Sequence, residues 1–170
     1  RTFLWVELGL QTIHEDTAVL INRCYPLSVY DKAVSDLHSR GIRVVTHLIF
    51  GLPGESRKQM LESVRYVCRD LPQESDRAAS LTRHIFGIKL HMLNLVKGSQ
   101  MATLHPNYVP FASIEEYVDL VVDALEIIPP DITIHRMSGD APRPTLIAPE
   151  WSYKKRTILN SIHKSLRDKK

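Results

Sequence analysis

Four apolar runs recur along the chain at nearly even intervals, and each is followed by a segment with helical periodicity. The runs begin near Phe3, Ile42, Ile85 and Ile132, so their starts lie 39, 43 and 47 residues apart. Runs rich in large and β-branched residues indicate strands that are buried on both faces. Strands that alternate with helices imply parallel pairing through right-handed crossovers. The pattern therefore predicts an α/β fold, either a doubly wound sheet or part of a (βα) barrel.

Apolar side chains at helical spacing predict four helices. Their inner stripes are Tyr30, Ala33, Val34 and Leu37; Met60, Val64, Val67 and Cys68; Ile114, Tyr117, Val118, Val121 and Leu125; and Ile158, Leu159, Ile162 and Leu166 in a last helix over Ser152 to Arg167. Ser56 with Gln59 and Ser113 with Glu116 have the spacing of a capping box. We place a domain boundary after residue 130, with residues 131–170 as a C-terminal extension.

The segment from Gly41 to Glu55 runs from an apolar strand directly into a Gly-Leu-Pro-Gly turn. Gly51 and Gly54 allow backbone geometries closed to other residues and let a ligand approach closely. Strand, turn and helix N-terminus together place backbone donors at the carboxyl end of a sheet, where α/β proteins bind ligands. The turn is therefore a candidate binding site, and a purely structural βα turn is the alternative.

Polar residues also occur on and after the first strand. Glu7 lies inside an apolar run, so its carboxylate needs a partner or a ligand, unless it faces the edge or forms a salt bridge. Gln11 offers donors and an acceptor at the carboxyl end of this strand. Arg23 follows twelve residues later and could form a fork with a ligand carboxylate, although an isolated arginine is usually a solvated surface residue.

Other polar residues lie on the second and third strands and after the fourth. His47 is either packed in the core or aimed into a site, and the sequence alone favours the packed position. The third strand carries Lys89, His91 and Asn94, followed by Lys97 at a turn, and its late backbone could edge an aromatic ligand. A barrel strand with a loop lysine is the alternative. Further on, a segment rich in proline and glycine carries three charged residues, for which we favour substrate contact: Arg136, Asp140 and Arg143.

Composition narrows the class of protein. The chain has 170 residues, of which 44% are hydrophobic and 24% charged, which is typical of one globular domain. No run approaches the ~20 apolar residues of a membrane span, so we expect a cytoplasmic protein. A net charge of +3 is compatible with nucleic acid without requiring it. The chain opens at Arg1 and enters an apolar run almost at once, so we expect a piece of a longer protein.

The ordered set of ELGLQT, INR, THLIFGLPGE and IKLHMLNLVKGS resembles the second half of a radical S-adenosylmethionine (SAM) enzyme. It is similar to strands four to six of that superfamily's partial barrel, and oxygen-independent coproporphyrinogen oxidase has a similar Gln-to-Arg spacing and GLP turn. IHRMSGDAP and APEWSYK further resemble an Elongator-like group of bacterial radical SAM proteins. The resemblance implies half of a partial, TIM-like (βα) barrel over residues 1–130, followed by a helical extension.

The cofactor contacts that the resemblance implies are Gln11, Arg23, His47, Ile49, Gly51, Leu95 and Val96. Gln11 and Arg23 would contact the ribose and methionine ends of SAM, while backbone near Leu95 and Val96 would edge the adenine. His47 stands where the coproporphyrinogen enzyme has an acidic residue. Candidate substrate contacts are Glu7, Arg136 and Asp140.

The superfamily's CxxxCxxC loop, which holds a [4Fe-4S] cluster, is absent from this sequence. Cys24 and Cys68 cannot replace it, so we expect the cluster in the full-length protein and no activity from this chain alone. The implied chemistry is reductive cleavage of SAM to a 5′-deoxyadenosyl radical, with flavodoxin or ferredoxin as reductant and RNA or a small molecule as substrate.

Two other functions stay open from the sequence. One is a (βα)-barrel lyase or aldolase that uses Lys89 or Lys97 as a Schiff base. The other is a non-catalytic module that binds a nucleotide or RNA through the Gly-rich turn and the basic C-terminal helix. If the strand at Phe3 forms an open sheet edge, we also expect the chain to self-associate.

Overall fold

The computed structural model describes residues 3–70, 84–139 and 141–169. Its centre is a four-stranded parallel sheet in the order β1-β2-β3-β5, with β1 (Trp5–Gln11), β2 (Arg43–Phe50), β3 (Gly87–Met92) and β5 (Thr133–Arg136). Each strand begins within two residues of its predicted start. The predicted α/β class and parallel pairing are therefore confirmed.

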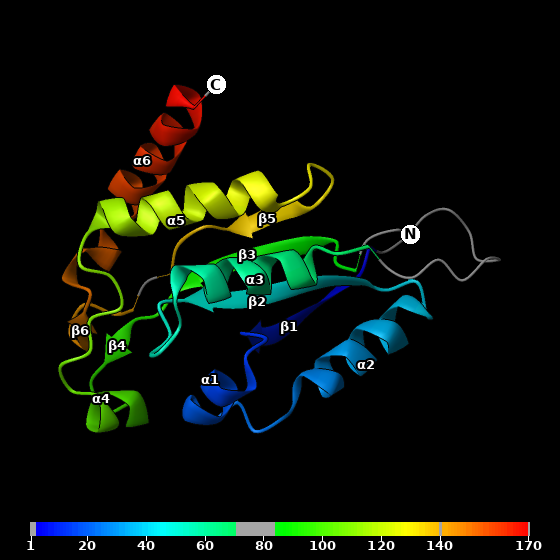
Figure 1. Ribbon diagram of the computed structural model, residues 1–170, viewed down its shortest axis with the longest axis horizontal. Coiled ribbons are helices and arrows are strands. Elements are labelled where there is room, and N and C mark those ends of the chain that lie inside the picture. The colour runs from blue at the N-terminus through cyan, green and yellow to red at the C-terminus, as the bar shows by residue number, and fades with distance from the viewer. Residues whose placement is uncertain (1–2, 71–83, 140, 170) are drawn as a thin grey trace.

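Four long helices accompany the sheet: α2 (Leu27–His38), α3 (Arg57–Val67), α5 (Ile114–Ile127) and α6 (Lys155–Asp168). In Figure 1, α3 lies in front of the sheet, α2 below it and α5 above it, while α6 leads away from α5 toward the C-terminus. The predicted apolar stripes form the contacts with the core. Val34, Val64, Val121, Ile158 and Ile162 are all fully buried.

The two faces of the sheet differ because side chains alternate along each strand. One face packs against the helices and supplies the core with Leu10, Val44, Leu48, Phe50, Ile88, Leu90 and Met92. The alternate positions carry Glu7, Gly9 and Gln11 of β1, His47 and Ile49 of β2, and Lys89 and His91 of β3. We call this second surface the polar face.

Several short elements were not predicted. They are α1 (Glu15–Leu20), α4 (Gln100–Leu104), β4 (Leu95–Val96), β6 (Leu146–Ala148) and a 3-10 turn over Glu150–Tyr153 that precedes α6. The predicted third strand ends at Met92 instead of continuing. There Asn94 donates from its side chain to the Met92 carbonyl (3.1 Å), and the chain turns away so that β4 pairs antiparallel with β6.

The two predicted capping boxes have different outcomes. At α3, Ser56 accepts from the Gln59 amide and Gln59 accepts from the Ser56 amide, so this box is complete. At α5, Ser113 accepts from the Glu116 amide, but the Glu116 carboxylate accepts from Ala112 N (2.8 Å). The second box is therefore only half formed, because the carboxylate reaches one residue further back.

Residues on both sides of position 130 share one core. β5 pairs with β3, and α6 packs against α5 through the fully buried Ile158 and Ile162. The domain boundary at this position stays a prediction.

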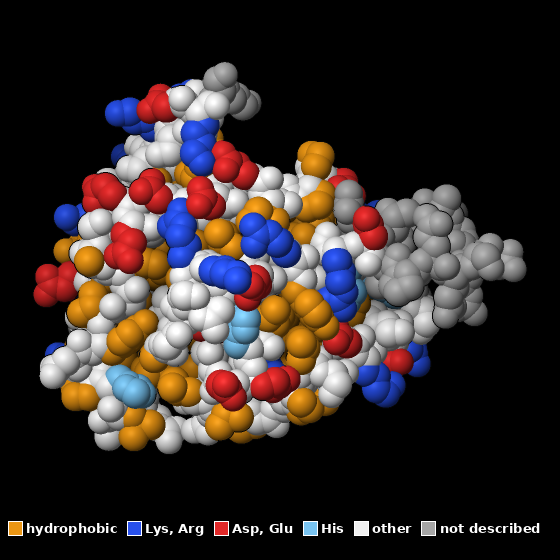
Figure 2. Space-filling view, viewed as in Figure 1, with side chains coloured by type: hydrophobic (Ala, Val, Ile, Leu, Met, Phe, Trp, Pro, Cys, Tyr) orange, Lys and Arg blue, Asp and Glu red, His pale blue; other side chains and the backbone are white. Residues whose placement is uncertain are grey.

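The side of the molecule that the helices cover carries a mixture of hydrophobic and charged side chains. Figure 2 shows hydrophobic side chains scattered among charged ones on this face, with acidic side chains along the outer side of α5. Glu115, Glu116, Asp119 and Glu126 are exposed there, as helical spacing predicts. Within the described ranges, the helices lack the length and apolar character needed to cross a membrane.

Candidate ligand-binding site

The carboxyl end of β1 carries Gln11 in an unusual backbone conformation. The register shifts between Gly9 and Gln11, which forms a bulge in the pairing with β2. The Thr12 amide donates to the Leu10 carbonyl (2.9 Å), so Gln11 is the central residue of a γ-turn, with φ of +68°. Bulges re-aim side chains, and a positive φ is strained in a residue other than glycine. The bulge and the γ-turn therefore hold the Gln11 side chain in one orientation, and the positive φ makes this backbone conformation unfavourable in energy.

The Gln11 amide lies over Gly9 on the polar face. A Cβ at Gly9 would approach Gln11 Nε2 to 2.9 Å, so glycine leaves the room that this amide occupies. Gln11 Oε1 is buried and accepts no hydrogen bond from the described residues. A buried acceptor without a donor costs stability unless a ligand supplies one.

Arg23 does not form the open fork that the sequence suggested. Its side chain is only 2% exposed and is engaged by the chain itself. Nη1 donates to the carbonyls of Leu10 (3.3 Å) and Thr12 (2.6 Å), and Nη2 donates to Glu15 Oε2 (3.1 Å). Nε donates to the Tyr25 carbonyl (2.9 Å). Direct contact between Arg23 and a cofactor stays a prediction, and in this structure the guanidinium binds the end of β1.

The Gly-Leu-Pro-Gly turn follows β2 beside this site. Gly51 and Gly54 have φ of +81° and +84°, as predicted for positions that need glycine. Gly51 is also confined, because a Cβ there would lie 2.7 Å from the Phe111 ring and 2.8 Å from Pro110 Cβ. The Gly51 carbonyl accepts from the Tyr108 hydroxyl (2.9 Å). The turn is therefore held rigidly by residues from the segment before α5.

Glu55 ties this turn to the end of β1. The Thr12 hydroxyl donates to the Glu55 carboxylate, and Thr12 is fully buried. Burial raises the pKa of Glu55, while the hydrogen bond from Thr12 opposes that shift. The carboxyl ends of β1 and β2 thus form one connected unit.

The end of β3 completes the same edge of the sheet. Leu95 is buried and Val96 half-buried, and both pair with β6. His91 Nε2 and Asn94 Oδ1 are buried without a partner among the described residues. Gly139 passes close by, since a Cβ on it would lie 3.5 Å from Asn94 Nδ2 and 3.6 Å from His91 Nδ1. The ends of β1 and β3 therefore present polar atoms without a partner among the described residues, on Gln11, His91 and Asn94.

The polar face carries a charged group centred on Glu7. Lys89 and His47 both donate toward the same Glu7 oxygen, His47 from 3.0 Å. The hydrogen bond from Lys89 is the main reason why the pKa of Glu7 falls to about 2. Glu7 is therefore salt-bridged in this structure, and its contact with substrate stays a prediction. The packed-core position for His47 is wrong, because its side chain is 26% exposed and bonded to Glu7.

His91 lies beside this charged group, although the sequence did not predict it as a cofactor or substrate contact. Its ring centroid is 5.3 Å from that of His47. Burial, and then the charges of His47, Arg136 and Lys89, lower the pKa of His91 to about 4. Histidine spacing along the sequence could not show this pairing, because the two residues lie on different strands. The available signal was the alternation of Lys89 and His91 on one face of β3.

The remaining predicted substrate contacts are less well defined. Arg136 is exposed at the end of β5, and its charge lowers the pKa of both His47 and His91. It therefore belongs to the same electrostatic environment as the polar face. Asp140 lies outside the described residues.

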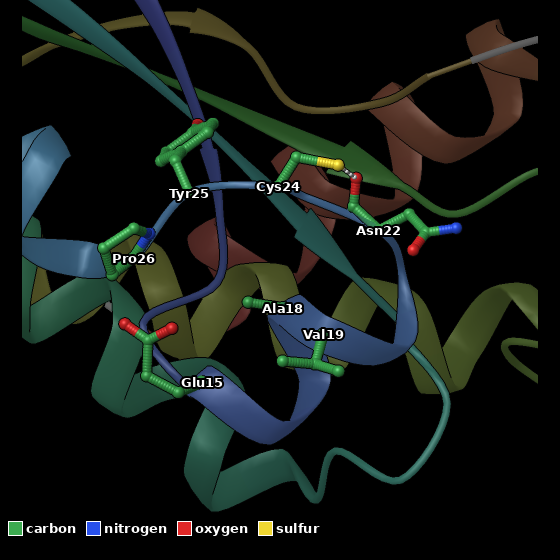
Figure 3. A pocket seen from close by; sticks show the side chains of 7 residues that line it. All are labelled: Glu15, Ala18, Val19, Asn22, Cys24, Tyr25 and Pro26. Carbon is green, nitrogen blue, oxygen red and sulfur yellow. Dashed lines mark hydrogen bonds between the residues drawn. The ribbon is translucent and has the colours of Figure 1, made fainter.

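Two hollows lie on the outer side of the β1 end. One, of about 370 Å³, is lined by Glu15, Ala18, Val19, Asn22, Cys24, Tyr25 and Pro26. Figure 3 shows the Cys24 thiol turned toward Asn22, whose carbonyl accepts from it at 3.0 Å. The other hollow, of the same volume, lies between α1 and the Gly-Leu-Pro-Gly turn, next to Pro53 and Gly54. Neither is lined by a predicted contact residue.

The fold is an α/β partial barrel, and its candidate site lies at the carboxyl ends of the strands. Family models agree with this class. The model of the radical SAM superfamily matches residues 2–67, and the model of the radical SAM C-terminal domain matches residues 85–168. The chain belongs to the radical SAM superfamily.

Individual relatives support this assignment. The chain is 44% identical over 170 residues to the uncharacterized protein YtqA of Bacillus subtilis, which covers 99% of this chain and 49% of that protein. It is 26% identical over 144 residues to Elongator complex protein 3 of Schizosaccharomyces pombe, covering 82% of this chain and 24% of that protein. The chain spans about half the length of YtqA.

A solved structure shows the same fold. The archaeal Methanocaldococcus infernus Elp3 with an N-terminal deletion superposes with a TM-score of 0.74 at 19% identity, over 95% of this chain and 36% of that one. The predicted half-barrel with C-terminal helices is confirmed by this match.

Radical SAM proteins use SAM and a [4Fe-4S] cluster, and the residues of this chain fit the two differently. The buried acceptor of Gln11, which has no donor among the described residues, fits SAM, which offers hydroxyl and amine donors. The cluster needs three thiolates, whereas this chain has two cysteines, one exposed after α1 and one buried at the end of α3. These residues do not fit the cluster.

Proposed function

We propose that this chain forms the SAM-binding half of the barrel of a radical SAM enzyme. The observation that carries the proposal is the buried Gln11 Oε1, which has no donor among the residues that the structure describes. With the cluster of the full-length protein and one electron from a reductant, bound SAM would supply a 5′-deoxyadenosyl radical for hydrogen abstraction from substrate. The residues of this chain bind and orient SAM and exclude water.

Five of the predicted contacts have roles that suit their positions. Gln11 Oε1 would accept a hydrogen bond from a ribose hydroxyl. Gly51 lets backbone approach the adenosyl group, and Ile49 offers an apolar wall on the polar face. Leu95 and Val96 present backbone at the adenine edge, where β6 holds them in place.

The polar face below this edge is the proposed substrate side. The ion pair of Glu7 with Lys89 gives this face a fixed dipole, and the exposed Arg136 adds positive charge. RNA or a small molecule is the proposed substrate class. Similarity to the tRNA uridine(34) acetyltransferase of Dehalococcoides mccartyi, 28% identical over 139 residues, and the exposed Lys154 and Arg156 before and within α6 favour RNA. A flavodoxin or ferredoxin reductant and a cytoplasmic location complete the proposal.

The test uses the full-length gene product, reconstituted anaerobically with iron and sulfide and reduced with dithionite. Formation of 5′-deoxyadenosine from SAM is the expected result. Gln11→Ala should weaken SAM binding about fivefold to tenfold, the value of one lost hydrogen bond. The matched control is Gln100→Ala, which removes an exposed amide that bonds only Asn22 in the described contacts. No product from a protein with an intact cluster would favour the non-catalytic binding module.

The Schiff-base alternative is disfavoured at Lys89. Its ammonium is bound to Glu7 and only 18% exposed, so a free amine at this position would have to break an ion pair. Borohydride trapping of a carbonyl substrate on Lys89 or Lys97 would restore this alternative.

A further inference from the structure

Gln11 and Arg23, both predicted to contact the cofactor, differ in whether their polar atoms are free to bind it. Gln11 presents a buried acceptor without a partner among the described residues, whereas the Arg23 guanidinium is occupied by the chain. The carbonyls that Arg23 binds belong to Leu10 and Thr12, which flank Gln11 on either side. Arg23 therefore clamps the γ-turn whose centre is Gln11.

The clamp matters because the turn is strained. A non-glycine residue at a φ of +68° costs about 1 to 3 kcal/mol, so it persists only where its surroundings enforce it. Three contacts enforce it here besides the γ-turn hydrogen bond. Arg23 binds the flanking carbonyls, the Tyr25 hydroxyl donates to the Gly9 carbonyl, and the Thr12 hydroxyl donates to Glu55.

We infer that Arg23 is a positioning residue, which acts on SAM through Gln11 by holding the γ-turn that aims the Gln11 amide. This inference rests on the proposed function, because it takes SAM as the ligand of Gln11. Glu15 keeps the guanidinium in place by binding Nη2 and by accepting from the Leu27 amide at the start of α2 (2.6 Å). Through Glu15 and Arg23, the start of α2 is thereby connected to the conformation of Gln11 at the end of β1.

A double-mutant cycle tests the inference. SAM affinity of the reconstituted full-length protein is measured by calorimetry for the wild type, Gln11→Ala, Arg23→Gln and the double variant. If Arg23 acts only through Gln11, Arg23→Gln weakens binding by no more than Gln11→Ala does, about fivefold to tenfold. The double variant then binds no more weakly than Gln11→Ala. Multiplied losses, or unchanged affinity in Arg23→Gln, would overturn the inference.

The matched control is Arg69→Gln. Arg69 also donates to a backbone carbonyl, that of Tyr66, and to a carboxylate, that of Asp31, but at the end of α3 far from Gln11 in the sequence. It should leave SAM affinity unchanged. If Arg23→Gln does not fold, Gly9→Ala replaces it, because the added Cβ meets the flexible Gln11 amide at 2.9 Å and displaces it. Gly9→Ala should weaken SAM binding in the wild type and not in Gln11→Ala, and equal losses in both would overturn the inference.

A second readout needs no ligand. The Thr12 amide closes the γ-turn, so its hydrogen exchange reports whether the turn persists. Exchange should be faster in Arg23→Gln and unchanged in Arg69→Gln, and equal protection in both would refute the clamp. If the wild type binds no SAM while Arg23→Gln accelerates this exchange, the proposed function fails and the clamp stands as a structural finding.

Discussion

The imidazole rings of His47 and His91 lie on neighbouring strands with their centroids 5.3 Å apart. Burial is the main cause that lowers the pKa of each, and the nearby charge of Lys89 lowers both further. Glu7 acts in the opposite direction on both rings. The polar face therefore holds two adjacent neutral imidazoles at neutral pH, next to one ion pair.

We expect His91 to make the protein less stable as the pH falls from about 6.5 to about 4. In the unfolded chain His91 takes up a proton near pH 6.5, whereas in the folded chain it does so only near its pKa of about 4. The unfolded state thus binds more protons within this window, and below it the loss from His91 is complete. Burial also lowers the pKa of His84 to about 4, so NMR titration should show two rings with midpoints near 4, of which one disappears in His91→Gln. A midpoint at or above 6.5 would contradict the burial of this ring.

Gly51→Ala should destabilise the protein by about 2 to 4 kcal/mol, because it combines a positive φ with steric overlap against Phe111 and Pro110. Gly54→Ala is the matched control. Gly54 has a similar φ, but a Cβ there meets nothing within 4 Å, so only about 1 kcal/mol is expected. Urea unfolding measures both, and equal losses would mean that Phe111 and Pro110 do not confine the turn.

The hydroxyls of Tyr30 and Thr46 share a buried hydrogen bond of 2.7 Å that joins α2 to β2. Either Tyr30→Phe or Thr46→Val leaves one buried hydroxyl without this partner, so each should cost about 1 to 3 kcal/mol. The double variant should cost less than the sum of the two, since no orphaned group remains. Strict additivity in chemical unfolding would show that the two hydroxyls are independently satisfied.

The 170-residue chain should self-associate at high concentration. Within the described sheet β1 is an edge strand, and Phe3, Leu4 and Trp5 beside its exposed edge are 56%, 60% and 41% exposed. A charge at such an edge opposes pairing, so Leu4→Lys should shift sedimentation toward the monomer. Val109→Lys adds the same charge at an exposed position away from this edge and should not. A wild-type chain that stays monomeric would exclude the edge as an association surface.

The sequence predicted the sheet and the long helices because their residues repeat at regular intervals. Val34, Val64 and Val121 lie in stripes that only a buried helix face requires. It also predicted that Gln11 and Gly51 occur at one edge of the sheet, since parallel strands end at the same edge. The two-residue strands β4 and β6 have no periodicity, so pattern alone could not reveal them.

The contacts of individual side chains were harder to predict than the helices and strands. Arg23 has a long side chain that could reach solvent, ligand or backbone, and only the folded γ-turn shows which carbonyls it meets. His47 lies in a strand whose two faces both carry mostly apolar residues. The sequence therefore could not show which face of the sheet the His47 side chain occupies. Its contact with Glu7 depends on the register between β1 and β2, which is set by the whole sheet.

The pairing of β4 with β6 has a consequence for the order of folding. It joins Leu95 to Ala148, so the ladder closes a long loop that contains α4, α5 and β5. Contacts between residues so distant in the sequence form late, because the entropy of closing the loop is lost before they contribute. We therefore expect the edge formed by Leu95 and Val96 to be among the last parts of the molecule to assemble. A ligand that rests on it can be held only by a chain that has finished folding.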